Sequence, residues 1–154
     1  MKIEVRNDNN LIVFLNHKYI DKINFNDRNS LETYFRQLFL KLKNIYQLKI
    51  SGYYDINVYI NEHYGIILEL FREPVECFDY FNSIDMKVNI INNSEFLYQV
   101  NDISEHYPTY LYKGKLYIRV NKNVSFIELG KIIENGTIVY GDIVEEILKY
   151  GEIK

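Results

Sequence analysis

The chain opens with two short apolar runs, Met1–Arg6 and Leu11–Asn16. Between them lies Asn7-Asp8-Asn9-Asn10. Asn and Asp favour turns because their side chains hydrogen-bond to the nearby backbone. The pattern therefore predicts a β-hairpin at the N-terminus.

The next periodic segment repeats every three or four residues, which is typical of an amphipathic helix. Its apolar stripe is Leu31, Phe35, Leu38, Phe39, Leu42 and Ile45. Asp27, Asn29 or Ser30 can cap its N-terminus. Basic residues occupy the opposite face.

Strict alternation follows in two segments that the turn 61–65 joins into a predicted hairpin. In the first segment Tyr54, Ile56, Val58 and Ile60 share one face, while Tyr53, Asp55, Asn57 and Tyr59 share the other. In the second segment Ile66, Leu68 and Leu70 lie opposite Ile67, Glu69 and Phe71. Residues 1–72 thus read as a ββαββ unit.

Residues 73–84 contain Pro74 and show no period, so we interpret them as a linker between two units. Phe78, Tyr80 and Phe81 are too apolar for a free tether. We therefore expect this linker to pack against one of the units.

The second half begins with a predicted strand, Met86–Ile91. Four apolar residues at helical spacing then predict a helix behind the cap Ser94. These residues are Phe96, Leu97, Val100 and Ile103. Tyr107–Tyr112 and Lys115–Val120 flank Lys113-Gly114 and predict a hairpin.

Two capping boxes predict the remaining helices, one at Ser125–Glu128 and one at Asp142–Glu145. Gly136 and Gly151 lie where these helices should stop. Thr137–Tyr140 reads as a short strand. Residues 85–154 therefore predict a ferredoxin-like βαββαβ unit with an extra C-terminal helix. The expected fold class is α+β.

Composition narrows the functional classes. The 154 residues are 47% hydrophobic and 25% charged, which is typical of a globular protein, and the net charge is -3. That charge disfavours nucleic acid as a default partner. The first ten residues lack the apolar core of a signal peptide, and no apolar run is long enough to span a bilayer. We expect a cytoplasmic protein without membrane contact.

No constellation of residues predicts catalysis. Cys77 is the single cysteine, and His17, His63 and His106 have no partner at metal-ligand spacing. The glycines form no phosphate-binding loop. The sequence predicts no cofactor, no metal and a non-enzymatic role. The alternative is an enzyme whose site assembles from distant residues, with His63 or His106 beside a carboxylate.

Tyrosines on the outer faces of the predicted sheets are the candidate partner-binding residues, because tyrosine is enriched at protein interfaces. The candidates are Tyr53, Tyr59, Tyr110, Tyr112, Tyr117 and Arg119. The alternative is that these tyrosines reflect A/T-rich codon usage, since Ala and Trp are absent, and that they pack under a helix. We expect another protein as the partner.

A second functional hypothesis is RNA or single-strand binding by the C-terminal unit. Lys113–Val120 lies where an RNA-recognition motif keeps its stacking octamer, and Tyr117 fits that motif. Lys115, however, replaces a stacking aromatic residue. Several basic residues nevertheless make the region locally positive: Lys87, Lys113, Lys115, Arg119 and Lys122.

Several short motifs resemble the MecA-type adaptors of Clp unfoldases. They are Val13-Phe14, Tyr19-Ile20-Asp21, Leu38-Phe39, the hairpin starting at Gly52, residues 110–117 (Tyr-Leu-Tyr-Lys-Gly-Lys-Leu-Tyr) and Leu148-Lys149-Tyr150-Gly151. The chain is shorter than that family and lacks its long acidic linker. The resemblance implies an N-terminal unit that recognises substrate, a C-terminal unit that docks on an unfoldase, and a role as a proteolytic adaptor or regulator.

Overall fold

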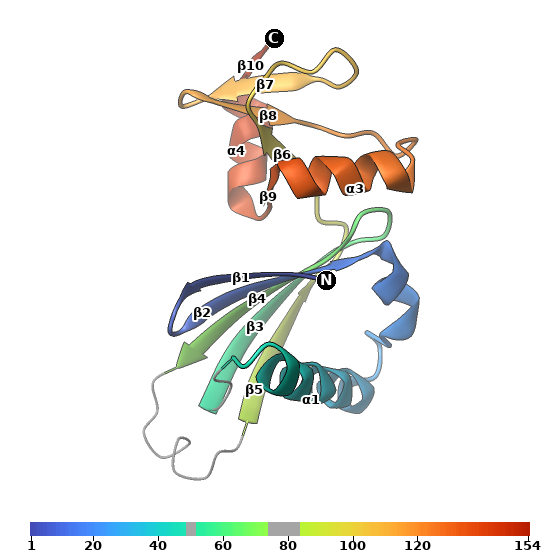
Figure 1. The fold of residues 1–154 in the computed structure, drawn as a ribbon, viewed down its shortest axis with the longest axis vertical. Coiled ribbons are helices and arrows are strands. Elements are labelled where there is room, and N and C mark those ends of the chain that lie inside the picture. Colours follow the sequence, from blue (N-terminus) through green and yellow to red (C-terminus); the bar gives the residue numbers. More distant parts are fainter. Residues whose placement is uncertain (49–51, 74–83) are drawn as a thin grey trace. The chain divides into compact units, whose positions relative to one another are not determined.

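The computed structural model describes residues 1–48, 52–73 and 84–154. They form an α+β protein that divides into two compact units, Met1–Ile91 and Asn92–Lys154 (Figure 1). Each unit contains one five-stranded sheet. No described helix is long and apolar enough to cross a membrane.

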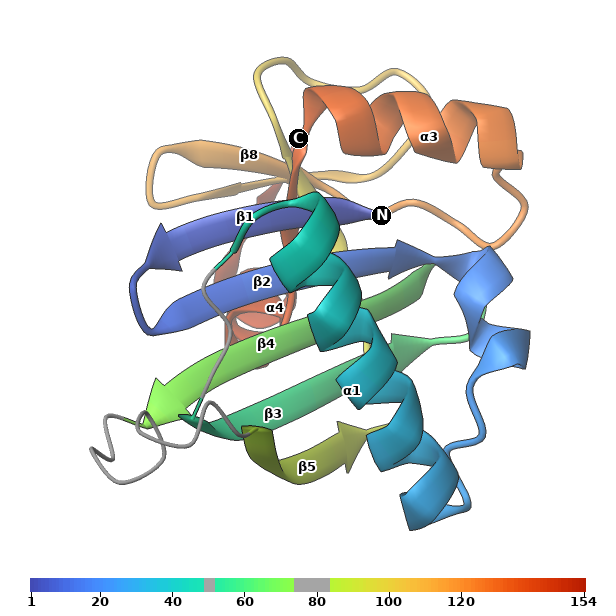
Figure 2. The same ribbon diagram turned by 60° about the horizontal axis from the view of Figure 1, so that its bottom comes forward.

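The N-terminal unit is a sheet with one long helix on one face (Figure 2). Its elements are β1 (Lys2–Asn7), β2 (Asn10–Asn16), the 3-10 helix η1 (His17–Lys22), α1 (Arg28–Ile45), β3 (Gly52–Asn61), β4 (Gly65–Glu73) and β5 (Ile84–Ile91). The strand order is β1-β2-β4-β3-β5, and β3–β5 is parallel while the other pairs are antiparallel. Both predicted hairpins and the predicted helix are confirmed.

Helix α1 begins where the sequence predicts. The Asp27 carboxylate accepts hydrogen bonds from the Ser30 hydroxyl (2.8 Å) and the Asn29 N–H (3.1 Å). These hydrogen bonds, with that of Ser30 first, lower the pKa of Asp27. The predicted stripe is buried from Leu31 to Leu42, whereas Ile45 at the C-terminal end is 65% exposed.

One glycine is required by backbone geometry at the start of β4. Gly65 has a φ of +138°, and a Cβ added there would lie 2.2 Å from the Leu15 carbonyl oxygen. β2 and β4 pair up to Asn16–Gly65, and the absence of a side chain at Gly65 lets the two strands approach this closely at the end of their ladder.

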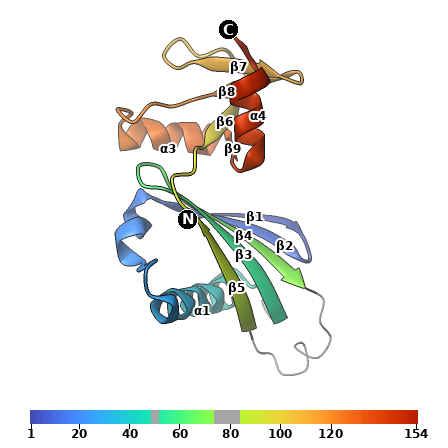
Figure 3. The ribbon, with the colours of Figure 1, turned by 180° about the vertical axis from the view of Figure 1, so that it is seen from behind.

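The C-terminal unit combines short strands with two helices (Figure 3). Its elements are β6 (Leu97–Val100), β7 (Thr109–Tyr112), β8 (Lys115–Ile118), α3 (Phe126–Asn135), β9 (Thr137–Val139), α4 (Asp142–Tyr150) and β10 (Glu152–Ile153). The strand order is β10-β7-β8-β6-β9, and all neighbouring strands are antiparallel.

Several details of this unit match the expectation. The Ser125 hydroxyl caps α3 by accepting the Glu128 N–H at 3.2 Å, and both helices end at the predicted glycines, Gly136 and Gly151. The second capping box is wrong, because Gly141 precedes α4 and no side chain caps that helix.

The ferredoxin-like arrangement is not confirmed by the strand order, because the strand expected to open that unit lies in the first sheet. β5 pairs with β3, and Met86 joins the N-terminal core with Val88 and Ile90 packed against it. The boundary between the units therefore follows Ile91, not residue 84. The expected linker 73–84 instead joins β4 to β5; its residues 74–83 lie outside the described part of the chain.

The prediction of a helix around residues 96–103 is also wrong, because Leu97–Val100 forms the strand β6. Leu97 and Tyr98 are both fully buried, although adjacent residues of a strand point to opposite faces. A strand that is buried on both faces has an apolar run instead of an alternating one. The apolar residues of this segment happen to recur at helical spacing, which led to the wrong prediction.

Candidate functional site

The face of the N-terminal sheet opposite α1 carries Tyr53 and Tyr59, as the alternation predicted. Pairing places Tyr59 beside Ile67 on β4 and Ile91 on β5. The two tyrosines are half-buried, and Ile91 remains 38% exposed. Phe71, which faces the same way, is 37% exposed. Phe71 and Ile91 are therefore partly accessible on this face, whereas Ile12, Phe14 and Ile67, which face the same way, are buried.

A chain of polar side chains crosses the centre of the same face. The Asn57 amide donates to Glu69 Oε1 (3.0 Å). The Asn89 amide donates to Asp55 Oδ1 (2.9 Å) and to Asn57 Oδ1 (3.0 Å). These hydrogen bonds link β3, β4 and β5, and they fix the orientations of the four side chains that take part in them.

We call this surface the outer face. It comprises Tyr53, Asp55, Asn57, Tyr59, Glu69, Phe71, Asn89 and Ile91. Its aromatic rings can contact apolar groups, while its carboxylates and amides can accept or donate hydrogen bonds.

The tyrosines of the C-terminal unit have a different environment. Tyr110 and Tyr117 pair across β7 and β8, are each 8% exposed, and share a core with Val144 and Ile147 of α4. The Tyr112 hydroxyl donates to Glu146 of the same helix at 2.9 Å. The expectation of an exposed face is therefore corrected for Tyr110 and Tyr117, which are buried against α4 as the packing alternative predicted, whereas Tyr112 is half-buried and packs against the same core.

Arg119 follows β8 and is engaged within its own unit. Its guanidinium forms an ion pair with Glu95 and a hydrogen bond with Tyr110. Burial opposes the charged form, but the carboxylate of Glu95 and the bond to Tyr110 outweigh it and raise the pKa of Arg119. With Tyr117 buried, this region lacks the exposed ring that base stacking requires.

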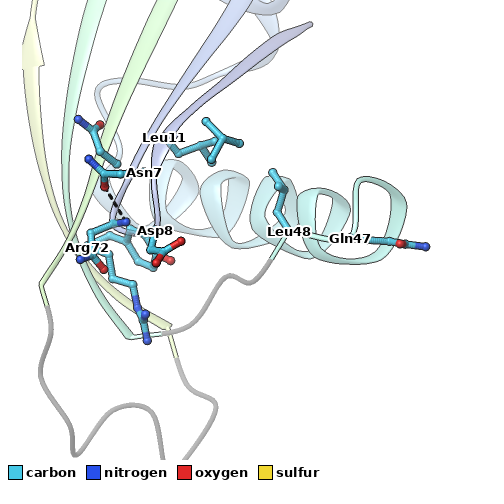
Figure 4. A pocket seen from close by; sticks show the side chains of 10 residues that line it. Asn7, Asp8, Leu11, Gln47, Leu48 and Arg72 are labelled. Carbon is cyan, nitrogen blue, oxygen red and sulfur yellow. Dashed lines mark hydrogen bonds between the residues drawn. The ribbon is translucent and has the colours of Figure 1, made fainter.

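A recess of about 450 Å³ opens beside the β1–β2 turn (Figure 4). Its lining residues are Val5, Asn7, Asp8, Asn9, Asn10, Leu11, Gln47, Leu48, Tyr54 and Arg72. Leu11 and Leu48 point toward each other across it, and Gln47 points away. The backbone N–H of Arg72 donates a hydrogen bond to the backbone carbonyl of Asn9 at 2.7 Å, and this bond holds the turn against β4.

The sequence predicts the turn but not this recess. The four turn residues indicated only a hairpin, and Arg72 at the end of an alternating segment gave no signal. The recess depends on the end of α1 reaching the sheet, which is a tertiary contact. It combines apolar walls with one basic and one acidic side chain, Arg72 and Asp8, so it can accept a small amphipathic group.

His17 and His63 lie near each other, and His63 lies beside Tyr64. Burial, followed by the charges of Lys18 and His63, lowers the pKa of His17. The ring of His63 contacts Tyr64, with centroids 4.9 Å apart. Among the described residues, no group of three or more His, Cys, Asp or Glu side chains could hold a metal ion. Cys77 lies outside the described residues.

Comparisons with protein-family models, with curated proteins and with solved structures found no match. The resemblance to the MecA-type adaptors therefore stays a prediction.

Proposed function

We propose that this protein is a non-enzymatic protein-binding module and that its partner binds the outer face of the N-terminal sheet. The observation that carries the proposal is the hydrogen-bonded chain Asp55–Asn89–Asn57–Glu69, set among accessible aromatic and aliphatic side chains. Aromatic side chains beside ordered polar groups are typical of protein interfaces.

Preorganisation adds to this argument. The polar side chains of the outer face are already held by one another, so a partner loses little additional side-chain entropy on binding them. Tyrosine contributes a large contact area with few rotatable bonds. The rigid sheet beneath positions both kinds of group.

The edges of the same sheet offer a second mode of binding. β5 is an edge strand of eight residues, and a partner strand could extend the sheet there. The other edge strand, β1, alternates charged residues at Lys2, Glu4 and Arg6, which disfavours strand addition. Strand addition at β5 would place the partner beside Ile91.

A role as proteolytic adaptor or regulator is the narrower form of this proposal. It is supported by the sequence resemblance and by the presence of two compact units. RNA binding by the C-terminal unit is the weaker alternative, because Tyr117 is buried and Arg119 is paired with Glu95.

Capture from a native lysate tests the proposal. Immobilised wild-type protein should recover a partner in stoichiometric amount, and Tyr59→Ala should lose it. Tyr46→Ala is the matched control, because Tyr46 is 46% exposed at the end of α1 and away from the outer face. Recovery of no such partner, or equal recovery by both variants, would count against the outer face.

A further inference from the structure

We infer that the partner of the outer face is a protein segment that presents an arginine, and that this arginine binds over Asp55 and Asn89. The inference rests on the proposed function and names the chemistry of the partner, a guanidinium group beside apolar side chains. The observation that points to it is the hydrogen-bonding capacity left in the polar row Asp55–Asn89–Asn57–Glu69.

The two carboxylates at the ends of this polar row set the direction of its hydrogen bonds. An ionised carboxylate can only accept, so Asn89 turns its amide NH2 group toward Asp55, and Asn57 turns its own toward Glu69. The side-chain oxygen of Asn57 then accepts from Asn89 at 3.0 Å. The side-chain oxygen of Asn89 therefore takes no part in the row.

Most donors of the polar row are used within it, whereas acceptors remain. Each amide has two N–H groups, and the row itself uses both of those of Asn89 and one of those of Asn57. Within residues 1–48, 52–73 and 84–154, nothing donates a hydrogen bond to the Asn89 oxygen or to Asp55 Oδ2. The outer face also has two carboxylates and no basic residue. It therefore offers acceptors and negative charge.

A guanidinium group matches these acceptors better than an ammonium group or a metal ion does. It carries five N–H donors in a planar fork and binds several oxygens at once, whereas an ammonium is a compact, strongly hydrated charge. In the part of the protein that the structure describes, no group of three or more His, Cys, Asp or Glu side chains could hold a metal ion. Nucleic acid is disfavoured because carboxylates repel its phosphates.

Phe71 provides the apolar contact that an arginine side chain also uses. It is the register partner of Asp55 on β4 and is 37% exposed. The apolar stem of an arginine can lie along this ring while its charged head reaches Asp55, and a cation is attracted to the face of an aromatic ring. Negative charge, free acceptors and an accessible ring therefore occur together at this point of the outer face.

Lys87 is a basic residue beside the outer face, and it provides a sharp test. It is the register partner of Asp55 on β5, is exposed, and forms no ion pair with any described residue. Its charge opposes a cationic partner. Lys87→Gln should therefore tighten the binding of an arginine peptide about twofold to threefold. A gain of affinity cannot result from misfolding, and a surface that binds acidic partners would show a loss.

Selection of random peptides displayed on phage, with the full chain as bait, provides the probes. Enriched peptides should contain arginine beside apolar residues. A synthetic copy of an enriched peptide should lose about tenfold in affinity when citrulline replaces its arginine, because citrulline keeps the shape and lacks the charge. Amide NMR shifts on binding should map to β3 and β5.

Charge-neutral variants then assign the surface. Asp55→Asn keeps an oxygen that can accept from Asn89 but removes the charge, and it should weaken binding of the arginine peptide roughly fivefold. Asp21→Asn on η1 is the matched control, because it makes the same change at an exposed position of the same unit, outside the outer face. This control should bind like wild type.

Three results would overturn the inference. The first is enrichment of peptides that lack arginine and yet map to β3 and β5. The second is an arginine peptide whose binding Asp55→Asn and Lys87→Gln leave unchanged, and the third is enrichment of no peptide. The first result rejects the arginine but leaves the outer face as the interface. Because lysate capture with Tyr59→Ala tests the outer face itself, failure of this inference is distinguishable from failure of the proposed function.

Discussion

Asn89 on β5 provides a sharp test of how the first sheet is built. Its side-chain amide donates hydrogen bonds to the Asp55 carboxylate and to the side-chain oxygen of Asn57, at 2.9 and 3.0 Å. Asn89→Ala removes both bonds and leaves the two acceptors to find water. A bond to a neutral acceptor contributes about 1 kcal/mol and one to a charged group about 2 kcal/mol. Because these groups are only partly buried, we expect a total loss of about 2 kcal/mol.

Hydrogen exchange measured by mass spectrometry gives the readout by segment. Exchange should accelerate in β3 and β4, which share a sheet with β5, and should stay unchanged in β7 and β8. Asn101→Ala, an exposed position of the C-terminal unit, is the control. Faster exchange in β7 and β8 with no change in β3 would refute the placement of β5 in the first sheet.

Three further predictions concern local geometry. Gly65→Ala should destabilise the N-terminal unit by about 3 kcal/mol or more, because of the 2.2 Å approach to Leu15 and the positive φ; urea unfolding measures this, and a loss below about 1 kcal/mol would contradict it. Tyr117→Ala should cost about 3 kcal/mol through the cavity under α4, whereas Tyr150→Ala, at 68% exposure, should cost under about 0.5 kcal/mol; equal losses would show that Tyr117 is not a core residue. The lowered pKa of Asp27 means that its cap stabilises α1 above the pKa of the unfolded chain and is lost as pH falls through the folded value; NMR titration should show this, and Ser30→Ala should return the pKa toward its ordinary value.

The first unit was largely predictable because its signals are local. Alternation in residues 53–60 and 66–71, the turn residues before Leu11, and the cap at Asp27 each specify an element without reference to distant parts of the chain. β5 was predicted in the wrong unit because parallel strands are not joined by a short turn. The sequence therefore carries no local turn signal that would identify β3 as the neighbour of β5. Nothing in Ile84–Ile91 itself indicates that β3 is its neighbour.

The candidate site was predictable only in part, for a related reason. Alternation shows which residues share a face, but not which face a helix will cover. Tyr53 and Tyr59 lie opposite α1, whereas Tyr110 and Tyr117 lie beneath α4, a helix about 30 residues further along the chain. The same residue type in the same pattern therefore belongs to a surface in one unit and to the core in the other.

Site-specific photo-crosslinking can capture a partner that is bound at the outer face. A benzophenone amino acid replaces Tyr59 on the outer face in one sample and Tyr46 at the end of α1 in another, and both are irradiated in cells. We expect one dominant protein adduct from position 59 and none of that protein from position 46. No adduct at position 59, or the same adduct from both positions, would contradict it.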